Sequence, residues 1–178
     1  MRGICAIDPG ESTGVAWGIV DDSRSAMAIP AVKARLRSGS ITLTGSEAHQ
    51  IRALYIRWTA FKRDCVQKGL LEPEWIDLVI EDFVLFPGER PGKVTTSPER
   101  IAWGFEGYRM AMLDSYHRKW RKHFTEITWQ KAGAAHRFNN QKILKQADAW
   151  VVGRQHERSA FAHLILRLNT VLDQNRRP

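Results

Sequence analysis

Near the N-terminus the chain reads Ile4-Cys5-Ala6-Ile7-Asp8-Pro9-Gly10, an apolar run that ends in an acid and then turns. Four consecutive apolar residues without alternation predict a strand that is covered on both faces. Pro9 and Gly10 stop this strand, so we expect Asp8 on rigid backbone at its end. The chain resumes as Val15-Ala16-Trp17-Gly18-Ile19-Val20, which predicts an antiparallel partner strand after the turn.

The composition is that of an ordinary globular protein. With 178 residues, of which 43% are hydrophobic and 26% charged, we expect one domain spanning 1–178 with a self-sufficient core. The sequence has no apolar run of about 18 residues and no basic-then-apolar leader, which predicts a cytoplasmic protein without membrane contact. Cys5 and Cys65 form no metal-binding spacing, so we expect both to be reduced residues of the core.

The net charge of +8 is distributed unevenly along the chain. Residues 1–108 contain 13 Lys or Arg against 14 Asp or Glu, whereas residues 109–178 contain 14 against 5. An excess of this size indicates a polyanionic partner, because each cation near a phosphate releases condensed counterions and strengthens binding. The alternative is a basic surface that is merely solvated.

Periodicity and turn residues predict the order of the remaining elements. We expect strands at 29–36, 40–44, 75–83 and 124–129, helices at 46–68, 97–118, 141–150 and 156–172, and loops at 85–96 and 133–140. Ser46 is a candidate N-cap, Gly69 a candidate stop, and Pro98 suits a first helical position. Three early strands followed by alternating helices and strands predict an α/β fold, a mixed β-sheet with helices on both faces.

The strand expected at 75–83 also ends in acids, and its Glu81 can lie beside Asp8 if the two strands are neighbours. Two adjacent carboxylates repel unless a cation separates them, and Mg²⁺ and Mn²⁺ prefer such oxygen ligands. Two such ions about 4 Å apart can orient a water and stabilise the leaving oxygen of a phosphodiester. Asp82 should point to the opposite face and ranks below Glu81 as a ligand. Alternatively, a strand-end Asp simply forms a turn.

The last predicted helix opens with His156-Glu157-Arg158-Ser159-Ala160-Phe161-Ala162-His163. Helical spacing places His156, Ser159, Ala160 and His163 on one face. The small Ala160 would let that face approach the sheet, so that His156 reaches a metal ion or a scissile phosphate. In the alternative interpretation, His156 is only a first-turn residue and His163 a surface or core histidine.

Three motifs occur in order along the chain: Ile7-Asp8-Pro9-Gly10 with Thr13-Gly14, then Val79-Ile80-Glu81, and then the helix that begins with His156. Together they resemble the RuvC family of Holliday junction resolvases, particularly its divergent bacteriophage members. The resemblance spans nearly the whole chain and implies a ribonuclease H-like fold. It also implies a homodimer that binds four-way DNA junctions and nicks two strands of like polarity, using Mg²⁺ or Mn²⁺. The expected location is the cytoplasm of a bacterium or of a phage-infected host.

The resemblance assigns four site residues. Asp8 and Glu81 match the first two metal-binding acids, and His156 matches the third position, where the family has an acid or a histidine. Ser159 matches the fourth catalytic position, where the family has aspartate, and a neutral serine is a poor ligand for Mg²⁺. Three alternatives follow: Glu157 replaces the acid after a helix shift, one firmly held metal works with His156, or the protein binds junctions without cutting.

Candidate DNA contacts are basic residues in the C-terminal part. The densest stretch is Tyr116-His117-Arg118-Lys119-Trp120-Arg121-Lys122-His123, whose cations can hold phosphates while its aromatic rings stack on a splayed base. Alternatively, this stretch is a solvated helix end with Trp120 in the core. Further phosphate candidates are Lys131, Arg137, Lys142, Lys145, Arg154 and Arg158. The resemblance adds Arg90 and Lys93, because the loop after the Glu81 strand approaches the junction centre in the family.

The helix expected at 97–118 carries more apolar surface than one sheet face needs. Its apolar residues are Ile101, Ala102, Phe105, Tyr108, Met112 and Leu113. Core packing explains most of them, and the resemblance implies that the rest belong to a homodimer interface. A third class of function, a small-molecule phosphotransferase of the actin-like type, is suggested only by the opening Asp-glycine turn. We rank it last because the chain is short and shows no second phosphate loop.

Overall fold

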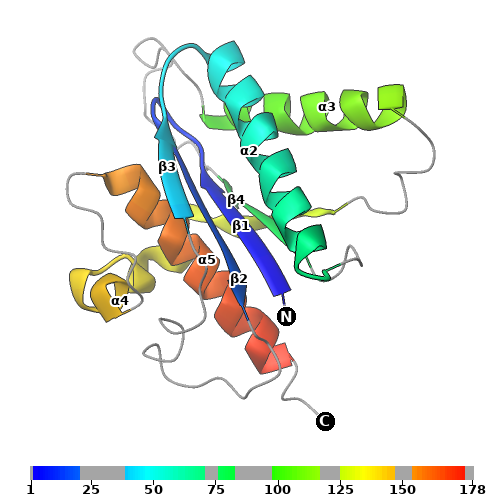
Figure 1. Cartoon of the computed structure of the whole chain (residues 1–178). Coiled ribbons are helices and arrows are strands. Elements are labelled where there is room, and N and C mark those ends of the chain that lie inside the picture. Colours follow the sequence, from blue (N-terminus) through cyan, green and yellow to red (C-terminus); the bar gives the residue numbers. More distant parts are fainter. Residues whose placement is uncertain are drawn as a thin grey trace.

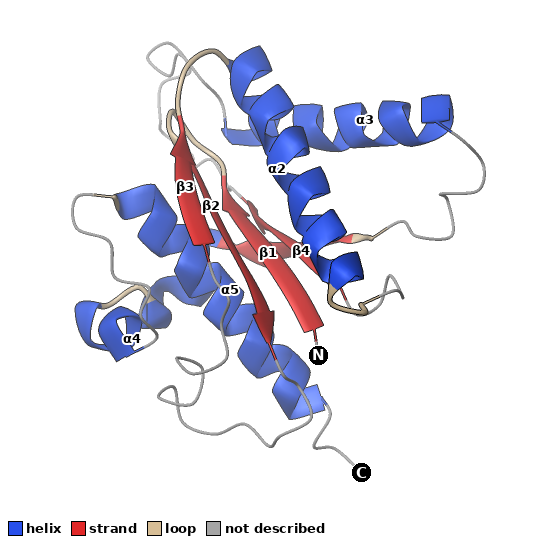
Figure 2. Ribbon diagram, in the orientation of Figure 1, coloured by secondary structure: helices blue, strands red, loops and turns tan. Residues whose placement is uncertain are grey.

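In the computed structural model, five strands form one mixed sheet in the order β3-β2-β1-β4-β5 (Figures 1 and 2). The structure describes residues 2–20, 39–70, 76–82, 98–116, 125–146 and 154–174. The strands are β1 Arg2–Asp8, β2 Thr13–Val20, β3 Gly39–Leu43, β4 Ile76–Asp82 and β5 Ile127–Lys131. The predicted α/β class and mixed sheet are thus confirmed.

The register of the sheet places the ends of its central strands side by side. β1 and β2 form the predicted antiparallel hairpin, in which Asp8 pairs with Gly14. β1 runs parallel to β4 with Ile7 opposite Ile80, so the next residues, Asp8 and Glu81, lie at the same edge of the sheet. β4 is parallel to β5, which forms the outer strand on that side.

Helices cover both faces of the sheet (Figure 1). Two long helices, α2 Glu47–Gln67 and α3 Pro98–Tyr116, pack against each other on one face. The other face carries α5 Gln155–Gln174, with the 3-10 helix η3 Ala132–Phe138 and α4 Gln141–Gln146 beside it. No helix in the described ranges is long and apolar enough to cross a membrane.

The predicted helix boundaries agree with local physical chemistry. The Ser46 hydroxyl accepts a hydrogen bond from the backbone N–H of His49 at 3.3 Å, as an N-cap should. Gly69 follows α2 with φ of +84°, a conformation that favours glycine and ends the helix. Pro98 occupies the first position of α3, where its missing N–H is not needed.

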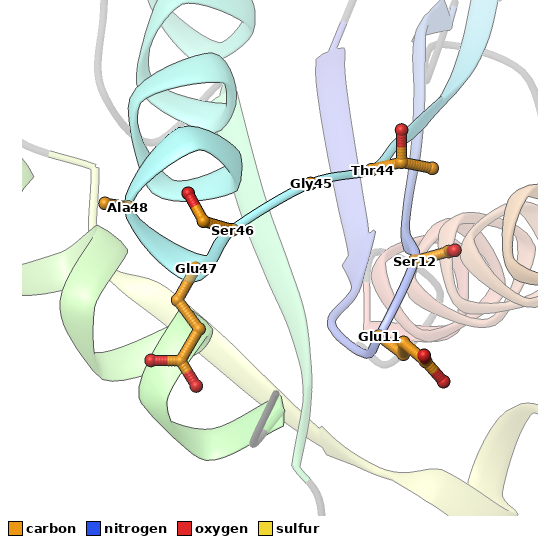
Figure 3. Close-up of a pocket in the computed structure, with 7 residues that line it drawn as sticks. All are labelled: Glu11, Ser12, Thr44, Gly45, Ser46, Glu47 and Ala48. Carbon is orange, nitrogen blue, oxygen red and sulfur yellow. The ribbon is translucent and has the colours of Figure 1, made fainter. Parts of the chain in front are cut away.

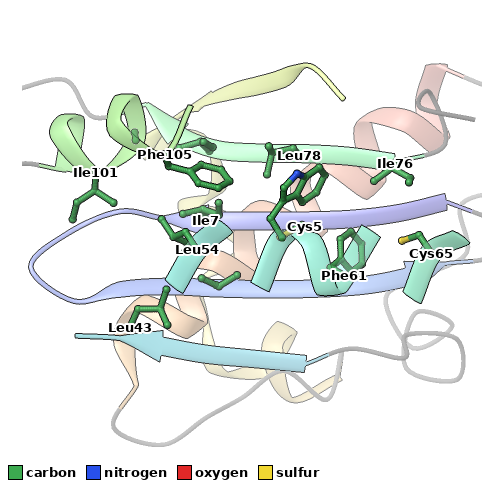
Figure 4. Packing of buried hydrophobic residues seen from close by; sticks show 14 of the residues in the cluster. Cys5, Ile7, Leu43, Leu54, Phe61, Cys65, Ile76, Leu78, Ile101 and Phe105 are labelled. Atoms are coloured by element: carbon green, nitrogen blue, oxygen red, sulfur yellow. The ribbon is translucent and has the colours of Figure 1, made fainter. Parts of the chain in front are cut away.

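Alternation along the buried strands divides the core into two layers. Under α2 and α3 lie Cys5, Ile7 and Leu78, together with Phe61 and Phe105 (Figure 4). The opposite layer contains the intervening residues of the same strands, packed on α5. Both cysteines are buried and free, as expected, and burial raises the pKa of the Cys65 thiol to about 12. Asp8 and Glu81 follow the alternation of the α5 layer.

One predicted loop is wrong. Residues 132–138, most of the loop expected at 133–140, form η3 instead. The 3-10 repeat of three residues per turn puts Ala135 and Phe138 on one side, where both are buried in the α5 layer. The fifth strand starts at Ile127 rather than at 124. The strand expected at 29–36, the loop at 85–96 and the end of the 141–150 helix lie outside the described residues.

The start of α5 lies directly against β2. A Cβ atom on Gly14 would overlap the backbone carbonyl of His156, so only glycine permits this approach. Ala16 and Ala160 are fully buried in the same layer and keep it thin. Backbone contact at Gly14 therefore fixes the position of the first turn of α5 on the sheet.

We expect Gly14→Ala to lower the free energy of unfolding by about 1–3 kcal/mol, because the added methyl group must push α5 away from β2. Gly107→Ala in α3 is the matched control: its Cβ would meet nothing within 4 Å. That change should stabilise the protein by about 0.5–1 kcal/mol, since alanine suits a helix interior better than glycine. Urea unfolding of both variants measures the difference, and equal effects would contradict the close contact.

Candidate active site

Two carboxylates lie together at the ends of the central parallel strands. Asp8 ends β1 and is 5% exposed, and Glu81 near the end of β4 is 6% exposed. Each influences the pKa of the other, as neighbouring carboxylates do. Asp82, the next residue, is exposed. The structure therefore brings together the two acids that the sequence pattern selects.

His156 joins the acids from the first turn of α5. Its Nδ1 atom lies 3.1 Å from Oδ2 of Asp8, while 40% of its side chain remains exposed. The N-terminal end of α5 also carries a partial positive charge, which favours negative groups nearby. His156 is thus placed to contact both Asp8 and a molecule in solvent.

A second histidine of α5 serves the other acid. His163 is fully buried, and its Nε2 lies 3.4 Å from Oε2 of Glu81. Its Nδ1 lies 2.8 Å from Oε1 of Gln130 on β5. Because an amide oxygen only accepts, Nδ1 carries a hydrogen and donates it to Gln130. This bond turns Nε2 toward Glu81, so Gln130 and His163 hold the carboxylate side of the cluster in place.

Sequence reasoning placed His163 on the site face but assigned it no role, and it missed Gln130. The strand predicted at 124–129 stopped one residue before Gln130. The face of the sheet to which the Gln130 side chain points could therefore not be predicted. A polar residue next to a strand end was the only available signal. Its burial and its bond to His163 depend on the pairing of β5 with β4, which leaves no local pattern.

Ser159 and Glu157 point to different neighbours. The Ser159 hydroxyl hydrogen-bonds to Glu81 and helps to keep that carboxyl charged. Glu157 is fully buried and accepts hydrogen bonds from Ser40 Oγ at 2.6 Å, Thr42 Oγ1 at 2.7 Å and Arg154 Nη1 at 3.0 Å. Glu157 is therefore tied to β3, and the alternative in which it replaces the fourth acid is not the arrangement observed.

Burial and mutual contact make the two acids unequal. Burial raises the pKa of Asp8 to about 7, with Glu81 adding to the rise and the His156 hydrogen bond opposing it. Burial also acts to raise the pKa of Glu81, but His163, Asp8 and Ser159 together hold it below its usual range. The hydrogen bond to Asp8 raises the pKa of His156. Near neutral pH, Glu81 is charged while Asp8 and His156 hold protons most readily.

The donor set suits a hard divalent cation. In the described part of the chain, no group of three or more His, Cys, Asp or Glu side chains is already arranged around an ion position. However, Oε2 of Glu81 is buried and makes no hydrogen bond among the described atoms, although His163 Nε2 lies 3.4 Å from it. Two neighbouring carboxylates, one of which has an oxygen that makes no hydrogen bond, provide the oxygen ligands that Mg²⁺ and Mn²⁺ prefer. Asp8 and Glu81 therefore fit such an ion, with His156 beside them.

The predicted DNA contacts are only partly described. Lys142 and Lys145 are exposed on α4, and Lys131 is exposed at the end of β5. Exposed Arg137 lies over the Phe138 ring at 4.7 Å, Arg154 pairs with Glu157, and Arg158 is half-buried on α5. The residues Arg90, Lys93, Arg118, Lys119, Arg121 and Lys122 lie outside the described ranges.

A wider depression of about 600 Å³ opens between the β1–β2 turn and the start of α2 (Figure 3). Glu11, Ser12, Thr44 and Glu47 are among its lining residues. Its wall contains neither Asp8 nor Glu81. The two carboxylates of the candidate active site therefore lie at the strand ends and not in this depression.

Comparison with known proteins shows which fold the chain has. No protein-family model and no curated protein sequence matches the chain. Among solved structures, RuvC of Thermus thermophilus matches with a TM-score of 0.53 and 10% identity over 97% of each chain. A second match, T. thermophilus RuvC in complex with a Holliday junction substrate, has a TM-score of 0.53 and 12% identity over 97% of this chain and 96% of that one. The chain has a RuvC-like, ribonuclease H-like fold.

Proposed function

We propose that the protein is a structure-selective endodeoxyribonuclease that resolves Holliday junctions and other branched DNA by metal-dependent phosphodiester hydrolysis. The observation that carries this proposal is the cluster of Asp8, Glu81 and His156 at adjoining strand ends, with Asp8 and His156 3.1 Å apart. The RuvC-like fold supports it, as does the Holliday junction bound to one of the similar structures.

Asp8 and Glu81 would hold Mg²⁺ or Mn²⁺, with His156 beside the ion. When bound, such an ion polarises the phosphate, lowers the pKa of a water and stabilises charge on the leaving oxygen. Glu81 is suited to this role because the neighbouring side chains, His163 first among them, hold its pKa below its usual range, so the carboxylate is charged near neutral pH. His163, itself held by Gln130, keeps that carboxylate oriented.

His156 would move the protons of the reaction. Its Nδ1–H donates to Asp8, which leaves Nε2 to face the substrate. A water oxygen attacks phosphorus as one P–O ester bond breaks. Nε2 would accept the proton of the attacking water and release it to solvent, and the leaving oxygen, on the opposite side of phosphorus, would take a proton from solvent, so that protons balance over the turnover. The exposed fraction of His156, 40% of its side chain, gives it the access that this step needs.

A second candidate function, junction binding without cutting, is favoured by Ser159. The hydroxyl at this position contacts Glu81 but supplies no charge. Glu157, the nearest acid on the same helix, is bound to Ser40, Thr42 and Arg154 instead. The described cluster therefore has two carboxylates where the RuvC family pattern has a further acid.

We infer a homodimer as the working form, because paired symmetric nicks need two sites. Ile101 and Phe105 of α3 are fully buried in the core and are not available to a partner. The charge excess of residues 109–178, including exposed Lys142 and Lys145, would hold the phosphates of the DNA arms. Binding should weaken steeply as salt concentration increases.

With Mg²⁺ or Mn²⁺, we expect the parent to nick a labelled four-way junction symmetrically and to leave a linear duplex of the same sequence intact. Asp8→Asn should slow nicking by about 100-fold or more, because it removes one of the two carboxylates that hold the ion. Asp64→Asn, which alters an exposed acid of α2, is the matched control and should cut like the parent. Gel analysis of the labelled strands gives both rates, and EDTA should stop the reaction.

Ser159→Asp separates the two candidate functions. If the parent binds junctions but does not cut, and Ser159→Asp cuts, then the protein is a binder whose site lacks one charge. If the parent cuts and Ser159→Asp only alters metal affinity, then the nuclease is active with serine. Absence of any preference for the junction over the duplex contradicts both candidates.

Without divalent metal, we expect the free energy of unfolding to fall as pH rises from about 4 to about 7. The pKa of Asp8 is about 7 in the folded protein but near its ordinary value after unfolding, so the contribution of Asp8 is complete below pH 4 and is lost toward pH 7. The slope from this one proton is at most about 1.4 kcal/mol per pH unit. His156, whose pKa is also raised, changes stability in the same direction.

Urea unfolding at several pH values measures this slope in the parent, in Asp8→Asn and in Asp64→Asn. The slope should shrink only in Asp8→Asn. Added Mg²⁺ at pH 8 should stabilise the parent more than Asp8→Asn, because an ion that binds only the folded chain shifts the equilibrium toward it. Equal slopes in all three proteins would show that Asp8 is not the group that titrates.

A further inference from the structure

Two tryptophans lie stacked and exposed beside the candidate site. Trp103 of α3 and Trp129 of β5 have ring centroids 5.0 Å apart, with an angle of 35° between the ring planes. Trp103 is 63% exposed, more than any other large apolar side chain in the described ranges, and Trp129 is 37% exposed. Because one residue belongs to a helix and the other to a strand, the pair is already formed and does not require a loop to move. Exposed aromatic surface of this kind indicates a binding function.

The pair lies at the same end of β4 and β5 as Glu81, on the face of the sheet that α3 covers. A cavity of about 50 Å³ is lined by Trp103 and Trp129 together with Glu81, Asp82 and Glu99. This volume is smaller than a nucleobase, so a planar ligand would stack on the open tryptophan face and insert only one edge. The cavity is on the α3 side of the sheet, whereas the Asp8 and Glu81 side chains follow the alternation of the α5 layer. A base held there therefore belongs to a nucleotide that passes the same strand ends as the phosphate at the acids, on the other face of the sheet.

The two acids that line the cavity beside the tryptophans determine which kind of ligand can bind there. Carboxylates such as Asp82 and Glu99 repel phosphate groups but accept hydrogen bonds from N–H groups. Cytosine, adenine and guanine present an exocyclic amino group on their pairing edge, whereas thymine presents mainly carbonyl oxygens. Tryptophan rings stack on any base, so the acids supply the preference. Phosphates of the same strand would be held by the basic surface, to which exposed Lys131 at the end of β5 belongs.

We propose that Trp103 and Trp129 form a stacking site for one unpaired, amino-bearing nucleobase of the DNA substrate, whose edge is recognised by Asp82 and Glu99. This inference rests on the proposed function, because it assumes that DNA occupies the acid cluster. It goes further by assigning a base-binding site and a sequence preference. A second copy of the chain is the competing occupant, and the test below separates the two.

Binding is measured in EDTA, so that cutting does not interfere, by fluorescence anisotropy on four-way junctions that carry one unpaired base at the crossover. The unpaired base is C, A, G or T in otherwise identical junctions. We expect Trp103→Ala to weaken binding to the C, A and G junctions by roughly 5- to 100-fold, the usual loss for one base stacked on an aromatic ring. Trp103→Phe should restore most of the affinity, because phenylalanine also stacks.

Met110→Ala is the matched control, since Met110 is a 45% exposed apolar residue of the same helix outside the cavity. It should bind like the parent. Asp82→Ala and Glu99→Ala should bind the T junction as well as they bind the C junction, whereas the parent prefers C. With 2-aminopurine as the unpaired base, its fluorescence should be quenched by the parent and not by Trp103→Ala.

Failure of the inference is distinct from failure of the proposed function. If the parent binds junctions and Trp103→Ala is indistinguishable from Met110→Ala, the stacking site is wrong while the proposed function stands. If the parent does not distinguish any junction from duplex DNA, both are wrong. If Trp103→Ala instead changes the molar mass in light scattering from dimer to monomer, the surface is an interface between copies and the stacking site is overturned.

Discussion

The contact between the backbone of α5 and Gly14 of β2 controls the rest of the site. Gly14 pairs with Asp8 across the hairpin, and the His156 backbone rests where a side chain of Gly14 would be. Because these two contacts share one residue, the start of α5 is fixed relative to the end of β1. The 3.1 Å approach of His156 to Asp8 is a consequence of this packing. The position of His156 beside Asp8 is therefore set by the packing of α5 on the sheet, while His163 and Gln130 orient Glu81.

The packing of α5 places a histidine beside each acid, and the two histidines differ in their exposure to solvent. His156 is partly exposed and contacts Asp8, whereas His163 is sealed in the core and faces Glu81. A buried imidazole that also donates to Gln130 has no route to exchange protons with a substrate, so its role is orientation. The exposed histidine can exchange protons with solvent. In the proposed function, one face of the helix would supply both a group for proton transfer, His156, and a group that orients Glu81, His163.

The sequence predicted those parts of the site that have a local pattern. Asp8 and Glu81 follow apolar runs, and His156 and His163 repeat at helical spacing, so strand ends and helix face could be read directly. Other parts depend on residues far apart in the chain. Glu157 bonds to Ser40 and Thr42 more than 100 positions away, and nothing in the run around it marks that contact. η3 was missed because short 3-10 turns have no hydrophobic period long enough to detect.

Ser159 affects the protonation of the two acids beside it. A third carboxylate beside Asp8 and Glu81 would add repulsion in a place where burial already raises the pKa of Asp8 to about 7. A hydroxyl at this position instead donates to Glu81 and favours its charged form. The folded chain then has one acid whose pKa is held below its usual range and one whose pKa is raised to about 7. A cation that is held by both acids, as the proposed function requires, would have to displace the proton of Asp8, so its binding would be coupled to proton release.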